Sequence, residues 1–133
     1  MILDLDETIL DNSGYQAWMT LRGTTFDPKT WNAYVNTVTS LAVPGALEFA
    51  RYADAKGVKV FYVSNRTAEE EPATRKNLEK LGFPMGSGVD TMLMSRKQPD
   101  WGSAKGTRRA FVAKSYRVLL NVGDNLGDFV DEY

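Results

Sequence analysis

The sequence contains no cysteine and no histidine among its 133 residues. Without cysteine there are no disulfides and no thiol nucleophiles, and without either residue the common zinc sites are excluded. The lack of histidine also excludes Ser-His-Asp hydrolysis and phosphohistidine chemistry. Any catalysis must therefore depend on carboxylates, hydroxyls, Lys, Arg or a hard cation.

No charge of one sign dominates, and no apolar run reaches the ~20 residues of a membrane-spanning helix. The 16 Lys and Arg against 17 Asp and Glu give a net charge of -1, which removes nucleic acid polymers as a default partner. The N-terminus turns acidic at Asp4, too early for a signal peptide, so we expect no membrane contact from this chain. The length predicts one domain over residues 1–133, and a homo-oligomer is compatible with it.

Four apolar runs predict β-strands, at residues 2–6, 58–63, 89–94 and 117–122. Their continuous hydrophobic character is typical of buried parallel sheets. The first run has only three residues before its acidic end, and the chain stops soon after the fourth run. We therefore expect fragment boundaries at both ends.

Helical patterns lie between the strands and carry start and stop signals. We expect helices from Asp27-Pro28 to Leu41, over 44–57, over 69–82, and from a cap at Ser103. Alternating strands and helices predict an α/β fold, a Rossmann-like parallel sheet with helices on both faces. The helix at 28–41 falls outside this alternation.

Polar clusters come directly after three of the predicted strands, at 4–8, 64–66 and 123–128. Open parallel sheets bind ligands at the carboxyl ends of their strands. Asp4 and Asp6 would share a strand face, and Asp124 and Asp128 would lie one turn apart if their loop is helical. Converging carboxylates repel one another unless a cation lies among them, and oxygen ligands favour a hard ion, first of all Mg²⁺.

Lys105 is the second informative residue, because a cation in the first turn of a helix opposes the helix dipole. A bound phosphate would compensate for this arrangement. The alternative is an ordinary solvated lysine.

These segments resemble the four motifs of the haloacid dehalogenase superfamily, and specifically those of its class C bacterial acid phosphatases. The matching residues are Asp4-Leu5-Asp6-Glu7-Thr8, Ser64-Asn65-Arg66, Lys105 and Gly123-Asp124-Asn125-Leu126-Gly127-Asp128. The resemblance spans nearly the whole chain. It implies a Mg²⁺-dependent acid phosphatase that hydrolyses small phosphomonoesters, typically nucleoside monophosphates, on a sheet of strand order 3-2-1-4.

The resemblance also implies features outside the catalytic motifs. Residues 9–43 correspond to a small helical cap-like insertion after the first strand. Members of the family are periplasmic, secreted or outer-membrane lipoproteins, and they usually carry a signal before the first motif and continue past the fourth. We therefore expect the chain to lack both flanks.

The resemblance and the chemistry of carboxylates together predict the catalytic roles. Asp4 would be the nucleophile that forms an aspartyl-phosphate, and Asp6 the acid that protonates the leaving group and later the base that activates water. Lys105 would offset the negative charge on Asp4 and the phosphoryl group. The alternative for the two aspartates is a solvated acidic turn.

For Mg²⁺ we expect ligands from the Asp4 carboxylate, the Asp6 backbone carbonyl and Asp124. Asp128 would be either a further ligand or a brace for a water or for Lys105, and the brace is favoured. The alternative for the segment 123–125 is a simple tight turn.

Ser64, Asn65 and Lys105 are the expected phosphate-binding residues. Outside the family context, Ser64-Asn65 would be interpreted as a helix cap. Arg66 would bind substrate or pair with an acidic residue in 69–71, and we favour the pairing.

Four aromatic residues are expected near the substrate or in the lid. Trp31 aligns with a ring that stacks on the nucleobase in the resembling family, yet it also lies on the apolar stripe of its helix, where rings usually pack. Trp18 and Phe26 would line the entrance or pack the lid. Tyr133 lies near where a second substrate ring is expected.

Three other functions remain compatible with the motifs. The chain could be a surface or scaffold relative that retains the Mg²⁺ site without turnover, or a phosphotransferase. A signalling receiver domain is also α/β with a phosphorylated Asp, but that Asp would lie on a middle strand.

Overall fold

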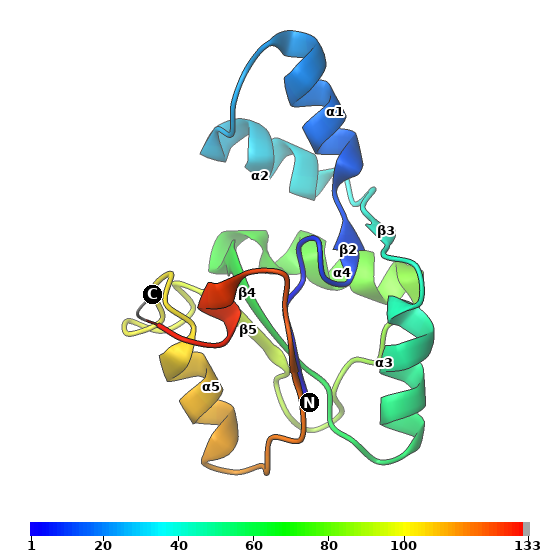
Figure 1. Cartoon of the computed structure of the whole chain (residues 1–133), viewed down its shortest axis with the longest axis vertical. Helices are drawn as coiled ribbons and strands as arrows, with labels where there is room; N and C mark the ends of the chain where they lie inside the picture. Colours follow the sequence, from blue (N-terminus) through cyan, green and yellow to red (C-terminus); the bar gives the residue numbers. More distant parts are fainter. Residues whose placement is uncertain (132–133) are drawn as a thin grey trace.

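The fold, seen in a computed structural model that describes residues 1–131, is built on a four-stranded parallel sheet (Figure 1). Its strands are β1 (Ile2–Leu3), β4 (Phe61–Thr67), β5 (Met92–Ser95) and β6 (Asn121–Val122). They lie in the order β5-β4-β1-β6, and each neighbouring pair is parallel. Counted along the chain, this is the predicted order 3-2-1-4, so the expected Rossmann-like topology is confirmed.

Helices cover both faces of the sheet, as predicted. α3 (Ala46–Ala55) and α4 (Glu71–Leu81) lie on one face, and α5 (Gly106–Ala113) lies on the other. Successive strand residues point to opposite faces, so Leu3 packs on the side of α3 and α4, and Ile2 packs on the side of α5. The sheet is therefore buried on both sides, which explains its uninterrupted apolar strands.

The sequence signals at both ends of α4 operate as expected. A short 3₁₀ turn (Ala68–Glu70) precedes the helix, and Thr67 and Glu70 form a reciprocal capping box around it. At the other end Gly82 adopts a φ of 88°. This left-handed conformation favours glycine and ends the helix.

The segment between the first two sheet strands folds apart from the sheet. It consists of β2 (Leu10–Asp11), α1 (Ser13–Arg22), α2 (Pro28–Asn36) and β3 (Leu41–Ala42). β2 and β3 form a two-stranded antiparallel pair. In Figure 1 the two helices stand above the end of the sheet toward which its strands run, joined to it through β2 and β3.

Two helix boundaries differ from the sequence-based expectation. The helix from Asp27-Pro28 ends at Asn36 rather than Leu41, because Val38 takes a φ of 57° and Leu41 pairs with Asp11 in β3. α5 begins at Gly106 with Lys105 at its N-cap position, so Ser103 does not cap it. α1 was not among the expected helices.

The strand boundaries also differ from those expected from the sequence. The expected strand at 117–122 shrinks to Asn121–Val122, because its only strand partner among the described residues is the two-residue β1. The strand expected at 89–94 begins at Met92, after the Asp90 carboxylate accepts the backbone N–H of that residue. The strand expected at 58–63 runs from Phe61 to Thr67 instead. Among the described residues no helix is long and apolar enough to cross a membrane.

Candidate active site

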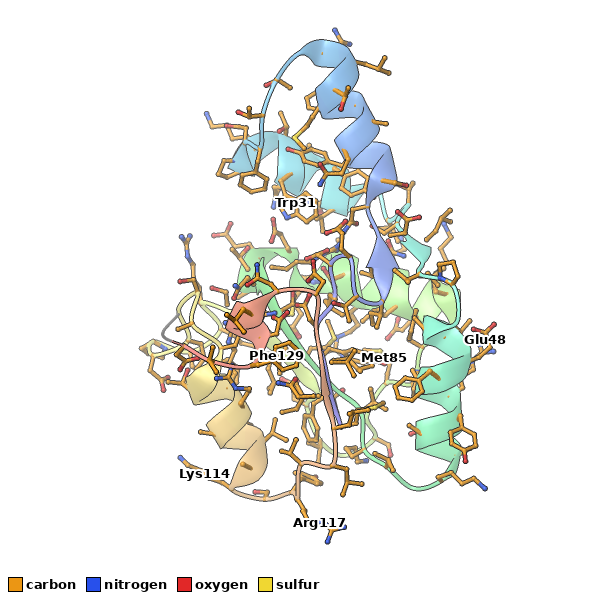
Figure 2. All side chains as sticks on the ribbon, in the orientation of Figure 1. Trp31, Glu48, Met85, Lys114, Arg117 and Phe129 are labelled. Carbon is orange, nitrogen blue, oxygen red and sulfur yellow. The ribbon has the colours of Figure 1, made fainter. Side chains whose placement is uncertain are left out.

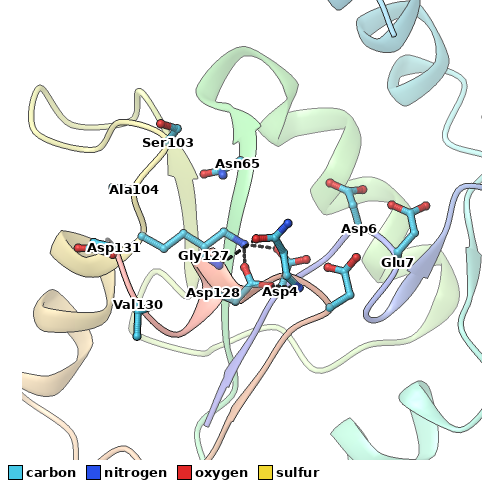
Figure 3. Close-up of a pocket in the computed structure, with 13 residues that line it drawn as sticks. Asp4, Asp6, Glu7, Asn65, Ser103, Ala104, Gly127, Asp128, Val130 and Asp131 are labelled. Atoms are coloured by element: carbon cyan, nitrogen blue, oxygen red, sulfur yellow. Dashed lines mark hydrogen bonds and ion pairs between the residues drawn. The ribbon is translucent and has the colours of Figure 1, made fainter. Parts of the chain in front are cut away.

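The carboxyl edge of the sheet holds a polar cavity of about 410 Å³ (Figure 3). Residues from the end of β1, from β4, from the loop before α5 and from the loop after β6 meet there. The lining residues are Asp4, Asp6, Glu7, Asn65, Ser103, Ala104, Lys105, Asp124, Asn125, Gly127, Asp128, Val130 and Asp131. Six of them are acidic and one is a lysine, so the cavity suits a cation and a ligand that Lys105 can neutralise.

Lys105 joins Asp4 to Asp128 at the centre of this cavity. Its Nζ donates to Oδ1 of Asp4 and, at 2.5 Å, to Oδ1 of Asp128. Only 5% of Lys105 is exposed, and both carboxylates are buried as well. The lysine that sequence reasoning singled out for opposing the helix dipole thus lies between two aspartates rather than in solvent.

Both partners of Lys105 are held by other groups of the site. Asp128 Oδ2 accepts the backbone N–H of Asn125 at 3.0 Å, so both of its oxygens are occupied. Asp4 Oδ2 accepts the hydroxyl of Thr8 at 3.4 Å. The hydrogen bonds of Asp128 are those expected of a brace for Lys105.

Burial raises the pKa of Asp4 to about 6 from its ordinary value of 3.8. Lys105 acts in the opposite direction through its charge and its hydrogen bond, while the negative charges of Asp128 and Asp6 add to the increase. Asp4 therefore stands in an environment that disfavours its charge unless a further cation is close.

Three carboxylates are grouped closely enough to hold such a cation. One oxygen from each of Asp4, Asp124 and Asp128 lies within 4.8 Å of the others. Asp4 and Asp124 follow neighbouring strands, as expected from the parallel sheet. The carboxylate of Asp6 is not part of this group.

Asp6 is instead paired with Arg66. The guanidinium Nε donates to both carboxylate oxygens, at 3.0 and 3.2 Å, and Nη2 donates to Oδ1 at 2.7 Å. The expected pairing of Arg66 with 69–71 was therefore wrong about its partner. Local sequence spacing favoured the neighbouring glutamates, whereas the sheet brings Arg66 beside the end of β1.

The motif at 64–66 lies within β4 rather than after it, at a shift in the pairing register between Ser64 and Thr67. Asn65 is exposed and lines the cavity. Ser64 is fully buried, and its hydroxyl oxygen accepts the backbone N–H of Arg66 at 3.1 Å.

Arg108 is a residue of the site that sequence reasoning missed. It is fully buried on α5 and donates to the Ser64 carbonyl at 2.5 Å, to Asn65 Oδ1 at 2.7 Å and to the Gly102 carbonyl at 2.8 Å. Burial lowers its pKa to about 10. Its place one helical turn after Lys105 was the available signal, because that spacing puts both side chains on one face.

Trp31 lies on the side of α2 that faces the sheet (Figure 2). The guanidinium carbon of Arg66 lies 5.4 Å from its ring centroid. Its ring also packs edge-on against Tyr15 at 5.1 Å and near Phe26 at 6.1 Å. Trp31 is thus part of a packed aromatic cluster and also contacts Arg66, the partner of Asp6.

The remaining aromatic residues are placed as follows. Trp18 stacks on Tyr15 at 5.8 Å and is 39% exposed, and Phe26 is 60% exposed. Both belong to the packing of α1 and α2. Tyr133, expected near the substrate, lies outside the described residues.

A parallel α/β sheet with a double-aspartate loop after its first strand, a buried lysine before α5 and an acidic loop after its last described strand defines the haloacid dehalogenase (HAD) class of protein. The family described as HAD superfamily, subfamily IIIB (Acid phosphatase), matches residues 1–133. The chain belongs to this family, which confirms the resemblance inferred from the motifs.

Individual relatives agree with this assignment. The class C acid phosphatase from Bacillus anthracis has 38% sequence identity and a TM-score of 0.87, over 97% of this chain and 52% of that one. Acid phosphatase 1 of Solanum lycopersicum is 28% identical over 97% of this chain and 51% of its own length. Vegetative storage protein 2 of Arabidopsis thaliana is 26% identical over 98% of this chain and 50% of its own length. The chain thus spans about half the length of these relatives.

Proposed function

We propose that the protein is a Mg²⁺-dependent acid phosphatase that hydrolyses small phosphomonoesters through an aspartyl-phosphate. The observation that carries the proposal is the buried contact of Lys105 with Asp4 and Asp128, beside Asp124, in the polar cavity. A carboxylate nucleophile, a fixed cation and a cluster of hard oxygen ligands are the groups that phosphoryl transfer needs.

In the first chemical step Asp4 attacks phosphorus. The new bond joins a carboxylate oxygen of Asp4 to phosphorus while the bond from phosphorus to the ester oxygen breaks. Asp6, which lines the same cavity, gives its proton to the departing alkoxide. Lys105 offsets the charge that accumulates on Asp4 and the phosphoryl oxygens.

In the second step water replaces Asp4 on phosphorus. Asp6 takes a proton from the attacking water, the water oxygen bonds to phosphorus, and the bond to Asp4 breaks. Inorganic phosphate leaves, and both aspartates return to their starting states. The ester is thus hydrolysed in two displacements, and Asp6 takes part in the proton transfer of each. The enzyme is unchanged at the end.

Asp4, Asp124 and the Asp6 backbone carbonyl would hold Mg²⁺, and the oxygen cluster fits a hard cation. Bound there, the ion would supply positive charge to the phosphoryl oxygens. Because Asp128 already bonds to Lys105 and to the Asn125 backbone, we assign it the role of brace rather than ligand. Asp124 is exposed, and one of its carboxylate oxygens lies within 4.8 Å of an oxygen of Asp4.

Nucleoside monophosphates are the proposed substrates. Asn65 and Lys105 line the cavity and are proposed to bind the phosphate, with the buried Ser64, the neighbour of Asn65 in β4, as a third proposed phosphate ligand. On α2, Trp31 lies against the Arg66 guanidinium and is proposed to stack on the nucleobase, with residues 9–43 acting as a cap. A second structure of the Bacillus anthracis phosphatase has bound tungstate, a tetrahedral oxyanion like phosphate.

The test is phosphate release from a nucleoside monophosphate with Mg²⁺ present. We expect activity that a chelator abolishes, that added Mg²⁺ restores, and that Asp4→Asn removes. Asp54→Asn, the same change at an exposed position on α3, should leave the rate unchanged. Full activity of Asp4→Asn would refute the assigned nucleophile.

A relative named as a storage protein makes a non-catalytic Mg²⁺-binding protein the second candidate. Magnesium binding without phosphate release would favour it. Capture of the phosphoryl group by an added alcohol would instead favour a phosphotransferase. The family relationship further leads us to propose a periplasmic, secreted or outer-membrane lipoprotein location, which cell fractionation would test.

A further inference from the structure

The two carboxylate oxygens of Asp6 have unequal surroundings. Oδ1 accepts three hydrogen bonds, from Arg66 Nε at 3.0 Å, from Arg66 Nη2 at 2.7 Å and from Asn12 Nδ2 at 2.8 Å. Oδ2 accepts one, from Arg66 Nε at 3.2 Å. A carboxylate oxygen with three donors has little capacity left, so Oδ2 is the oxygen with room for another partner.

The orientation of Asn12 is fixed by its own neighbours. Asn12 is fully buried, and its carbonyl oxygen accepts the Ser40 hydroxyl at 2.8 Å, the Tyr34 hydroxyl at 3.3 Å and Arg66 Nη2 at 3.3 Å. Since three donors surround that oxygen, the amide nitrogen must be the atom that faces Asp6. Tyr34 and Ser40 belong to the segment around α2, which therefore helps to set the Asp6 side chain.

Arg66 is fixed as firmly as Asn12. Its side chain is 1% exposed, and Nη1 donates to the buried hydroxyl of Thr74 on α4 at 3.1 Å. The ring of Trp31 covers the guanidinium at 5.4 Å. The Asp6 side chain keeps 23% of its area exposed and lines the cavity. The fixed partners thus hold one oxygen of a carboxylate that still reaches the cavity.

We propose that Asn12 and Arg66 are positioning residues, which engage Asp6 Oδ1 and so present Oδ2 to the oxygen of the leaving group. Oδ2 is then the atom that gives its proton as the phosphorus–oxygen bond breaks and takes one from water in the second step. The inference rests on the proposed phosphatase function and adds the residues that aim its acid. Neither Asn12 nor Arg66 lines the cavity.

The test compares two esters that differ in their need for a proton. An aryl phosphate releases a stable oxyanion, whereas an alkyl phosphate releases an alkoxide that must be protonated. We expect Arg66→Lys and Asn12→Ala each to lower kcat/KM for the alkyl ester by about 10-fold or more beyond any loss for the aryl ester. This loss is part of the ~10²–10⁴-fold rate increase that general acid catalysis supplies. Asp6→Asn sets the upper limit of this difference.

Arg75→Lys is the matched control, because Arg75 also pairs with a carboxylate, Glu71, but in a partly exposed position outside the cavity. It should leave both rates unchanged. Circular dichroism and thermal melting show whether each variant folds. If Arg66→Lys does not fold, Asn12→Ala carries the comparison, and failure of both to fold would overturn the positioning role in favour of a purely structural one.

Each other outcome separates this inference from the proposed function. Equal losses for both esters, or no loss, in folded variants would overturn the inference while the phosphatase function stands. A wild-type chain that releases no phosphate from either ester would overturn both. An Asp6→Asn variant that treats the two esters alike would show that Asp6 is not the acid, and the inference would fall with that assignment.

Discussion

Asp4 should make the free energy of unfolding fall as pH rises, whereas most surface aspartates make it rise. Replacing Asp4 with asparagine should therefore remove this fall. In the chain without metal, burial raises the pKa of Asp4 to about 6 from an ordinary 3.8. The folded state therefore holds the Asp4 proton more tightly than the unfolded state. Stability linked to this group is present below about pH 4 and is lost as pH rises toward and through about 6.

The magnitude follows from the two pKa values. The difference between 3.8 and about 6 corresponds to about 3 kcal/mol of unfolding free energy when both states are fully ionised. An asparagine at this position does not titrate. The unfolding free energy of the wild type minus that of Asp4→Asn should therefore fall by about 2 to 3 kcal/mol between pH 4 and 7.

Urea unfolding in the presence of a chelator, at pH values from 4 to 7, measures this difference. Asp11→Asn provides a control, because the backbone N–H of Ser13 lowers the pKa of Asp11 below its ordinary 3.8, so this carboxyl is ionised across the tested range. The wild-type minus Asp11→Asn difference in unfolding free energy should therefore stay nearly flat between pH 4 and 7. A wild-type minus Asp4→Asn difference that is flat or rising across this range would refute the inferred environment of Asp4.

Three further predictions concern packing and backbone. Leu78→Ala removes a fully buried side chain of α4 from the core and should cost about 2 to 5 kcal/mol in urea unfolding. Gly82→Ala places a Cβ on a residue with a φ of 88° and should cost about 1 kcal/mol of unfolding free energy, and an unchanged or increased stability would contradict its role in ending α4. Gly123→Ala would overlap the Asp128 carboxyl, so phosphate release should drop at least about 10-fold while the chain stays folded by circular dichroism.

The topology of the sheet was predictable because its signals are local and redundant. Each buried strand is an apolar run, and the parallel order follows once the connections are helices. The boundaries were less predictable, because the pairing partner decides where a strand ends. Residues 117–120 are apolar, yet the short β1 leaves only Asn121 and Val122 paired with it.

The candidate site also has a part that was predictable from the sequence and a part that was not. Asp4, Lys105 and Asp128 could be brought together from sequence because adjacent parallel strands end at one edge and because a lysine before a helix opposes its dipole. The pairing of Asp6 with Arg66 joins residues 60 positions apart through the packing of side chains. No local pattern encodes such a contact.

The two-residue strands β2 and β3 have a consequence for how this architecture can vary. The chain leaves the sheet and returns to it at adjacent points, held by the pairing of Leu10 with Ala42 and of Asp11 with Leu41. With that loop already closed at its base, helices of another length could be grafted between these strands at small entropic cost. Such a graft would leave Asp4, the proposed nucleophile, in place but exchange Trp31 and Tyr34, so the proposed contact with the base and the proposed positioning of Asp6 would change together.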